Sequence, residues 1–154
     1  MMEPTSSQKG KQAEFLVFGK LIEKGAELYL PVIDTGIDAI IRKKDGKYLE
    51  IQVKSTQRGW SFDLWGLDQL RPTEKRFIVC VDMSKQESEG KPKVWIFPSE
   101  IFKEYALPLR TKEGYIHHRL DLESKSKKHG NKKRGDMLAD YLDAWKLLTG
   151  DTPQ

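Results

Sequence analysis

The sequence predicts an α/β fold in which a mixed β-sheet of about five strands is flanked by helices. Apolar residues recur at helical spacing in residues 13–21 and again in residues 137–148, which predicts an amphipathic helix near each end of the chain. Segments 37–42 and 47–54 flank an Asp-Gly pair, a pattern typical of a tight β-hairpin. Segment 76–83 is apolar at nearly every position and is therefore expected in the centre of the sheet.

Length and composition predict one globular domain that spans residues 1–154. With 38% hydrophobic and 32% charged residues, the chain has the make-up of a water-soluble protein. Its apolar runs are shorter than the roughly 18–20 residues of a membrane span, and residues 1–12 lack the apolar segment of a secretory signal. We therefore expect a cytoplasmic protein without a membrane partner. Cys80 is the only cysteine, which excludes an internal disulfide and a Cys-based zinc site, and its apolar surroundings predict burial.

The N-terminal third begins with a helix. Ser6 and Ser7 offer an N-cap for a helix that runs to about Lys24, and Gly25 is well placed to end it. A first strand is expected over residues 27–32, ended by its proline. The turn that follows delivers Asp38 to the start of the hairpin.

The second hairpin strand carries a polar face. Because side chains alternate along a strand, Glu50, Gln52 and Lys54 lie on one face, and the apolar residues between them lie on the other. The hairpin can bring the carboxylate of Asp38 back beside Gln52 and Lys54. A carboxylate, an amide oxygen and an ammonium group are thus predicted to converge.

These residues carry a family resemblance. Asp38, followed across the hairpin by Gln52-Val53-Lys54, resembles the Asp…(Glu/Gln)-x-Lys signature of the PD-(D/E)xK nuclease superfamily. The Gln variant is similar to that of Mrr-type and Holliday-junction-resolvase-like nucleases. Glu14, in a helix with Val17 and Leu21, resembles the acidic residue of the family's first helix. The resemblance covers roughly residues 10–56. It departs from the family in two places: Ile33-Asp34 or Ile37-Asp38 stands where the name-giving Pro-Asp would be, and Gln52 replaces an acidic residue.

The resemblance implies a restriction-endonuclease-like fold and a Mg²⁺- or Mn²⁺-dependent endonuclease that hydrolyses phosphodiester bonds in DNA. It implies catalytic roles for Glu14, Asp38, Gln52 and Lys54, and metal ligation by Asp38, Gln52 and the backbone carbonyl of Val53. Glu14 and Glu50 are further candidates for metal ligation, although Glu50 lies nearly 7 Å along the strand from Gln52, which favours outer-shell support. Duplex cleavage suggests a homodimer with two symmetry-related sites. Two alternatives stay open: a non-catalytic nucleic-acid-binding protein of this fold, and an RNA-processing or junction-resolving nuclease.

The second half of the chain supplies further elements. Residues 57–66 alternate aromatic and polar side chains, which is typical of another sheet segment or of an exposed loop in which Trp60 or Trp65 stacks on bases. The sequence then predicts a helical turn at 67–73, a loop at 85–92, a strand at 93–97, a helix at 100–105 after Ser99, and an extended segment at 114–122. Adjacent strand residues point to opposite faces, so His117 and His118 are not expected to share a metal ion.

A basic segment, residues 124–134, precedes a predicted C-terminal helix over residues 135–149. The net charge of the chain is only +4, but the segment holds six Lys or Arg residues and no acid. Such a tract neutralises phosphates, although a solvated loop has the same composition. The residues expected to contact DNA, whether duplex or branched, are Lys125, Lys127, Lys128, Lys132, Lys133 and Arg134, together with Arg58.

Overall fold

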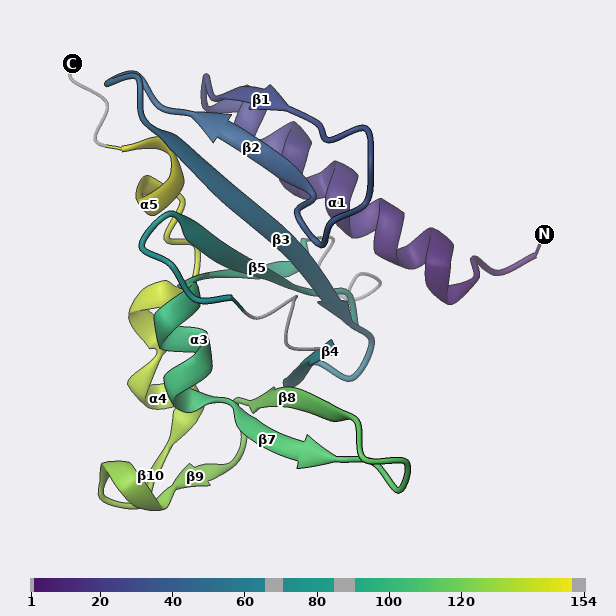
Figure 1. Ribbon diagram of the computed structural model, residues 1–154, viewed down its shortest axis with the longest axis vertical. Coiled ribbons are helices and arrows are strands. Elements are labelled where there is room, and N and C mark those ends of the chain that lie inside the picture. Colours follow the sequence, from purple (N-terminus) through teal and green to yellow (C-terminus); the bar gives the residue numbers. More distant parts are fainter. Residues whose placement is uncertain (1, 66–70, 85–90, 151–154) are drawn as a thin grey trace.

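The computed structural model describes residues 2–65, 71–84 and 91–150, and a five-stranded mixed sheet lies at its centre (Figure 1). The strand order is β1-β2-β3-β5-β6. Only β3 and β5 run parallel; the other neighbours are antiparallel. This confirms the predicted α/β class with a mixed five-stranded sheet. The bounds are β1 Glu27–Tyr29, β2 Ala39–Arg42, β3 Tyr48–Thr56, β5 Arg76–Asp82 and β6 Lys93–Pro98.

Helix α1 (Ser6–Glu23) packs on one face of this sheet. Its apolar stripe, Ala13, Val17 and Leu21, is fully buried against strand residues that include Ile51 and Val79. The N-cap differs from the predicted serines: Thr5 accepts from the backbone N–H of Gln8, and the Gln8 side chain accepts from the backbone N–H of Thr5. This reciprocal capping box satisfies two helix-terminal donors. Gly25 follows the helix with a φ of +86°, where glycine avoids a side-chain clash.

A second, three-stranded sheet packs on the opposite face. Its order is β4-β8-β7, with β4 at Ser61–Trp65, β7 at Leu107–Arg110 and β8 at Ile116–Asp121. Phe62 and Leu120 join Ile78 and Cys80 of β5 in a core that helix α3 (Ser99–Tyr105) completes. Segment 61–65 is therefore a strand, one of the two alternatives that its alternation left open, and it belongs to a sheet that the sequence did not predict. Cys80 is fully buried.

The prediction of one C-terminal helix over residues 135–149 is wrong. The chain forms two four-residue helices with a 3₁₀ turn between them. The bounds are α4 Arg134–Met137, the 3₁₀ turn Ala139–Tyr141 and α5 Lys146–Thr149.

The C-terminal segment is broken because its apolar residues serve both cores. Leu138 packs with the second sheet, whereas Trp145 and Leu148 pack on the α1 side. Between them Asp143, with a φ of +54°, donates its N–H to the carbonyl of Val94 at 2.8 Å, so the chain turns around the edge of β6. A straight helix presents one apolar stripe and cannot reach both faces of a sheet.

Two further expectations concern residues 67–92 and membrane-spanning helices. The predicted turn at 67–73 and loop at 85–92 lie largely outside the described residues. Within the described part of the chain, no helix has the length and apolar character needed to cross a membrane.

Candidate active site

Asp38 stands at the point where the hairpin opens. The turn at Gly46 sets the register in which Ala39 faces Ile51, and this register places Asp38 beside the middle of β3. The backbone N–H of Asp38 donates to the carbonyl of Ile51 at 2.9 Å. In return, the N–H of Val53 donates to Oδ2 of Asp38 at 2.6 Å. The carboxylate is therefore fixed by backbone geometry rather than by a mobile partner.

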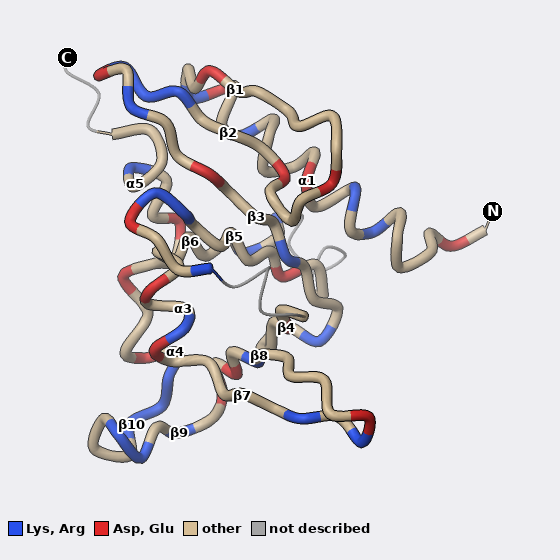
Figure 2. The backbone as a smooth tube through the Cα atoms, in the orientation of Figure 1, with Lys and Arg blue, Asp and Glu red and all other residues tan. Residues whose placement is uncertain are grey.

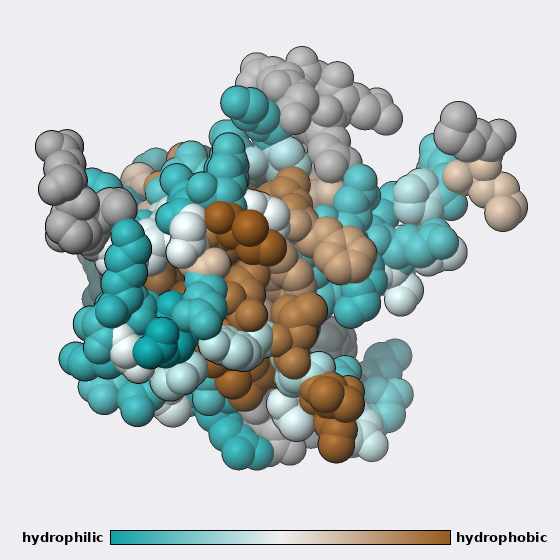
Figure 3. Space-filling view, turned by 90° about the horizontal axis from the view of Figure 1, so that it is seen from above, coloured by the Kyte–Doolittle hydropathy of each residue, from teal (hydrophilic) through white to brown (hydrophobic). Residues whose placement is uncertain are grey.

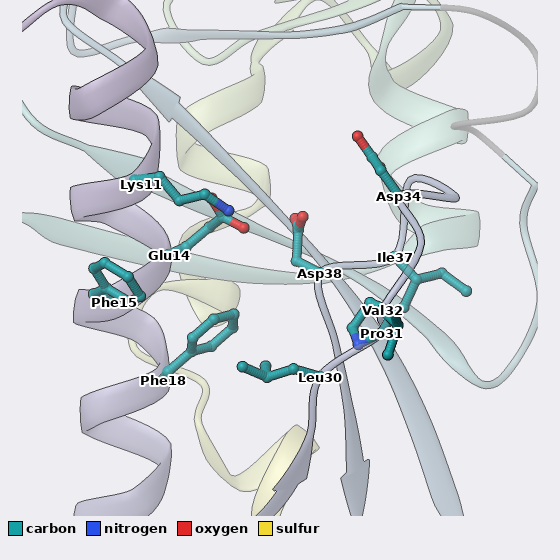
Figure 4. Close-up of a pocket in the computed structure, with 10 residues that line it drawn as sticks. All are labelled: Lys11, Glu14, Phe15, Phe18, Leu30, Pro31, Val32, Asp34, Ile37 and Asp38. Carbon is teal, nitrogen blue, oxygen red and sulfur yellow. The ribbon is translucent and has the colours of Figure 1, made fainter.

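Glu14 approaches Asp38 from helix α1. Figure 4 shows the two carboxylates close together on one side of a cleft that lies between α1 and the segment from Leu30 to Asp38. The Glu14 side chain is mostly buried, and Lys11, one helical turn earlier, lies 3.4 Å from it through Nζ. The structure thus brings together two acidic residues that are far apart in the sequence.

The environment of Asp38 favours its protonated form. The pKa of Asp38 is raised to about 6: burial is the largest cause, and the neighbouring carboxylate of Glu14, with a hydrogen bond between the two side chains, acts in the same direction. The Val53 N–H and the positive charge of Lys54 act in the opposite direction. Near neutral pH Asp38 is therefore mostly ionised, although its buried position makes the ionised form less stable than it would be in water.

Lys54 and Gln52 lie on the β3 face that is opposite to α1. Their strand partners are Cys80 and Ile78, which belong to the core beneath the second sheet. Burial lowers the pKa of Lys54, while the negative charge of Asp38 raises it in part. The charges of Lys54 and Asp38 therefore each shift the pKa of the other.

Gln52 is buried, and its Oε1 atom has no hydrogen-bond partner among the described residues. A buried amide oxygen without a partner is unusual, because the loss of hydration is not compensated. The carboxylates of Asp38 and Glu14 line one cleft and are hard oxygen donors of the kind that Mg²⁺ and Mn²⁺ accept, so these two residues fit a divalent cation. Among the described residues, no group of three or more His, Cys, Asp or Glu side chains is placed to hold a metal ion. Gln52 does not line the cleft in which Asp38 and Glu14 lie.

Glu50 and Arg58 are placed away from Asp38. Arg76 donates to Oε2 of Glu50 through Nε at 3.1 Å and through Nη2 at 3.0 Å, so Glu50 already has a cationic partner. Arg58 lines a separate cavity of about 360 Å³ beside Trp60.

The basic segment forms a small hairpin at the far end of the molecule. Figure 2 shows Lys and Arg concentrated around β9 (Lys125–Ser126) and β10 (Lys132–Lys133), at the end opposite to β1 and β2. A 3₁₀ turn, Lys127–His129, joins the two strands. The exposed lysines of the segment are Lys125, Lys127, Lys128 and Lys132.

Arg134 and Lys133 differ from the solvated cations that the sequence suggested. Arg134 is only 6% exposed, and its guanidinium donates to the carbonyls of Tyr105 and Lys125 and to Oγ of Ser124. It therefore holds the hairpin in shape. Lys133 lies 2.8 Å from Glu123. Neither feature is visible in the charge count of the segment, because both depend on tertiary contacts.

Residues that the sequence reasoning missed also contribute to the region. Lys11 and Asp34 line the cleft, and the carboxylate of Asp63, on β4 of the second sheet, raises the pKa of Lys54. On a helix, side chains three residues apart are neighbours, so the sequence alone could have predicted that Lys11 lies beside Glu14. Asp63 gave no such signal, because only the packing of the two sheets brings it near Lys54.

Because the pKa of Asp38 is raised, we expect Asp38→Asn to stabilise the protein at pH 7.5. The protonated form of Asp38 adds stability that is fully present below the unfolded pKa of 3.8 and is lost as the pH rises through about 6. Asparagine is neutral at every pH and can still accept from Val53. Since Asp38 is partly exposed, we expect a gain of about 1–2 kcal/mol in the free energy of unfolding.

Urea denaturation at pH 7.5 and pH 4.5 measures this effect. The gain should shrink at the lower pH, whereas the exposed control Asp140→Asn should change little at either pH. A loss of stability at pH 7.5 in Asp38→Asn would show that the carboxylate is favourable in the folded state.

The sheet order and the helix that packs on it are those of the restriction-endonuclease-like fold, on which PD-(D/E)xK nucleases are built. A solved structure with this architecture is similar: the bacterial homing endonuclease I-Ssp6803I matches with a TM-score of 0.57, over 94% of this chain and 91% of that chain, at 17% sequence identity. The fold implied by the resemblance is therefore confirmed. No protein-family model matches the sequence, and no curated protein matches it.

Proposed function

We propose that the protein is a metal-dependent endonuclease that hydrolyses phosphodiester bonds in DNA. One observation carries the proposal: on a restriction-endonuclease-like fold, the hairpin places Asp38 against the N–H of Val53, opposite Glu14 and within the electrostatic range of Lys54. Acids beside a desolvated lysine are the groups that phosphodiester hydrolysis requires.

Each residue has a separate task in this proposal. Asp38 and Glu14 would hold the divalent cation, and the carbonyl of Val53 and the amide oxygen of Gln52, which lies outside the cleft, are proposed as its further donors. When bound there, the cation neutralises charge on the phosphoryl oxygens and acidifies water. Lys54 orients the attacking water and stabilises the negative charge that develops on the phosphate. Because burial lowers the pKa of Lys54, a larger fraction of its amine is neutral than in a surface lysine. Only the neutral amine can accept a proton as a general base.

A non-catalytic DNA-binding protein of the same fold is the second candidate. Its support is Gln52, because a neutral amide in place of a carboxylate removes one negative charge from the cation site. The fold and the exposed lysines of the basic segment suit either candidate.

A cleavage assay separates the two candidates. Purified protein is incubated with plasmid, linear, branched and single-stranded DNA, and with RNA, in Mg²⁺, Mn²⁺ or chelator. Cleavage of DNA that requires the metal supports the endonuclease. Binding without cleavage in either metal supports the second candidate, and preferential cleavage of RNA or of junctions supports the remaining alternative.

We also expect the protein to be a homodimer, because two symmetry-related sites are the simplest way to cut both strands of a duplex. Light scattering at tens of micromolar protein, a concentration at which a dimer with micromolar affinity is populated, measures the mass. A monomer that still makes double-strand breaks would contradict this expectation.

A further inference from the structure

The cleft at Asp38 has two chemically different ends. It encloses about 370 Å³ between α1 and the segment that joins β1 to β2. Glu14 and Asp38 point toward one end, and Phe18 and Leu30 approach each other at the other (Figure 4). Phe15 and Val32 complete the apolar end. The cleft is thus amphipathic along its length.

The apolar end is unusually exposed. Phe15 is 66% exposed, Leu30 is 61% exposed and Val32 is fully exposed. Single apolar residues on a surface are common, but these three come from two segments and line one cleft. Figure 3 views the molecule from above and shows an area of hydrophobic side chains on the surface seen from that side. Contiguous exposed apolar surface of this kind marks a binding site.

The charges of the cleft decide what can occupy it. Its ionisable side chains are three carboxylates, Glu14, Asp34 and Asp38, and one cation, Lys11. An apolar surface from a second copy of the chain would cover these carboxylates without supplying a cation, which is unfavourable. The occupant must instead combine a flat apolar part with a group that brings positive charge to the acidic end. A nucleotide whose phosphate arrives with a divalent cation meets both requirements.

We infer that the apolar end of the cleft holds the base of the nucleotide next to the scissile phosphate, unstacked from its neighbours and placed against the ring of Phe15. This inference rests on the proposed function, and it defines the substrate more closely. A base inside an intact duplex is paired and stacked on both sides, so it must leave the helix before it can enter the cleft. DNA that is already unpaired at the cut, in a bubble, a flap or a branch, avoids that cost and is the preferred substrate.

Two substrates and two variants test the inference. The substrates are a fully paired duplex and the same duplex with a short mismatched bubble; cleavage is measured in Mg²⁺ and binding by fluorescence anisotropy in Ca²⁺. We expect the wild type to prefer the bubble about ten-fold or more. Phe15→Gln removes the stacking ring and should lose about ten-fold on the bubble while the duplex changes little. Ile22→Gln is the matched control: Ile22 is on the same helix and 62% exposed but does not line the cleft, so it should behave as wild type.

The outcomes distinguish this inference from the proposed function. Failure of the wild type to cleave any substrate would count against the proposed endonuclease activity. The relative affinity for bubble and duplex in Ca²⁺ would still show whether the cleft binds an unpaired base. Equal binding and cleavage of bubble and duplex by the wild type overturns the inference. So does an unchanged preference in Phe15→Gln. If that variant instead changes the mass measured by light scattering while keeping the preference, the apolar end is a contact between copies of the chain and the inference is wrong.

Discussion

Replacing Asp38 with asparagine or Lys54 with methionine should reduce metal-dependent cleavage by about 10²–10⁴-fold. Asp38→Asn keeps an acceptor for the N–H of Val53 but removes the charge that we propose holds a cation. Lys54→Met fills the half-buried site with an unbranched side chain one atom shorter than lysine and removes the ammonium that we propose acts on the phosphate. In both variants the shape of the site is kept, so the loss reports chemistry. Single-turnover cleavage at saturating DNA measures it, and circular dichroism checks the fold.

Two conservative controls accompany these variants. Asp140→Asn and Lys47→Met make the same chemical changes at exposed positions and should cleave at the wild-type rate. Glu50→Gln tests whether Glu50 is a cation ligand or only the ion-pair partner of Arg76. Because Glu50 is already paired with Arg76, we expect lower stability but a much smaller loss of cleavage than in Asp38→Asn. Wild-type cleavage by both Asp38→Asn and Lys54→Met would exclude this site from the reaction.

The hairpin could be predicted because its signals are local. An Asp-Gly pair specifies the turn, the turn fixes the register of β2 on β3, and the period of two then decides which side chains share a face. Asp38 was therefore placed beside β3 from the sequence alone. Helix α1 was equally readable, since one buried stripe and a glycine stop suffice to define it.

The other parts depend on partners that are distant in the chain. The alternation of residues 61–65 was compatible with a strand or an exposed loop, because the partner strand β8 lies more than fifty residues later and no local pattern states which sheet a strand joins. The C-terminal apolar residues had helical spacing, yet they are shared between two cores. Arg134 is the clearest case at single-residue level: its charge suggested a phosphate contact, whereas three hydrogen bonds within the fold use its guanidinium.

Replacing Lys127, Lys128 and Lys132 with glutamine should weaken DNA binding and make it less sensitive to salt. These lysines are exposed at the end of the molecule opposite to the cleft, so they can contribute affinity on a long duplex but cannot touch the scissile phosphate. Each phosphate contact that is lost lowers the log–log salt slope by about 0.9, which gives a change of about 2.7 for three contacts. The advantage of the wild type should therefore shrink by about 40-fold between roughly 50 and 200 mM salt.

Fluorescence anisotropy over that salt range measures the slope, and a variant with the same loss of charge provides the control. Lys43, Lys44 and Lys47 form the tip of the β2–β3 hairpin, away from β9 and β10 (Figure 1), and their replacement by glutamine should leave the slope nearer to that of the wild type. Cleavage at saturating DNA should be unaffected by the substitutions in the basic segment, since the cleft is untouched. An unchanged slope would mean that the segment is a solvated hairpin. Arg58 would then be the next cation to test, because it was not changed in this variant and lines a cavity of its own beside Trp60 and Lys133.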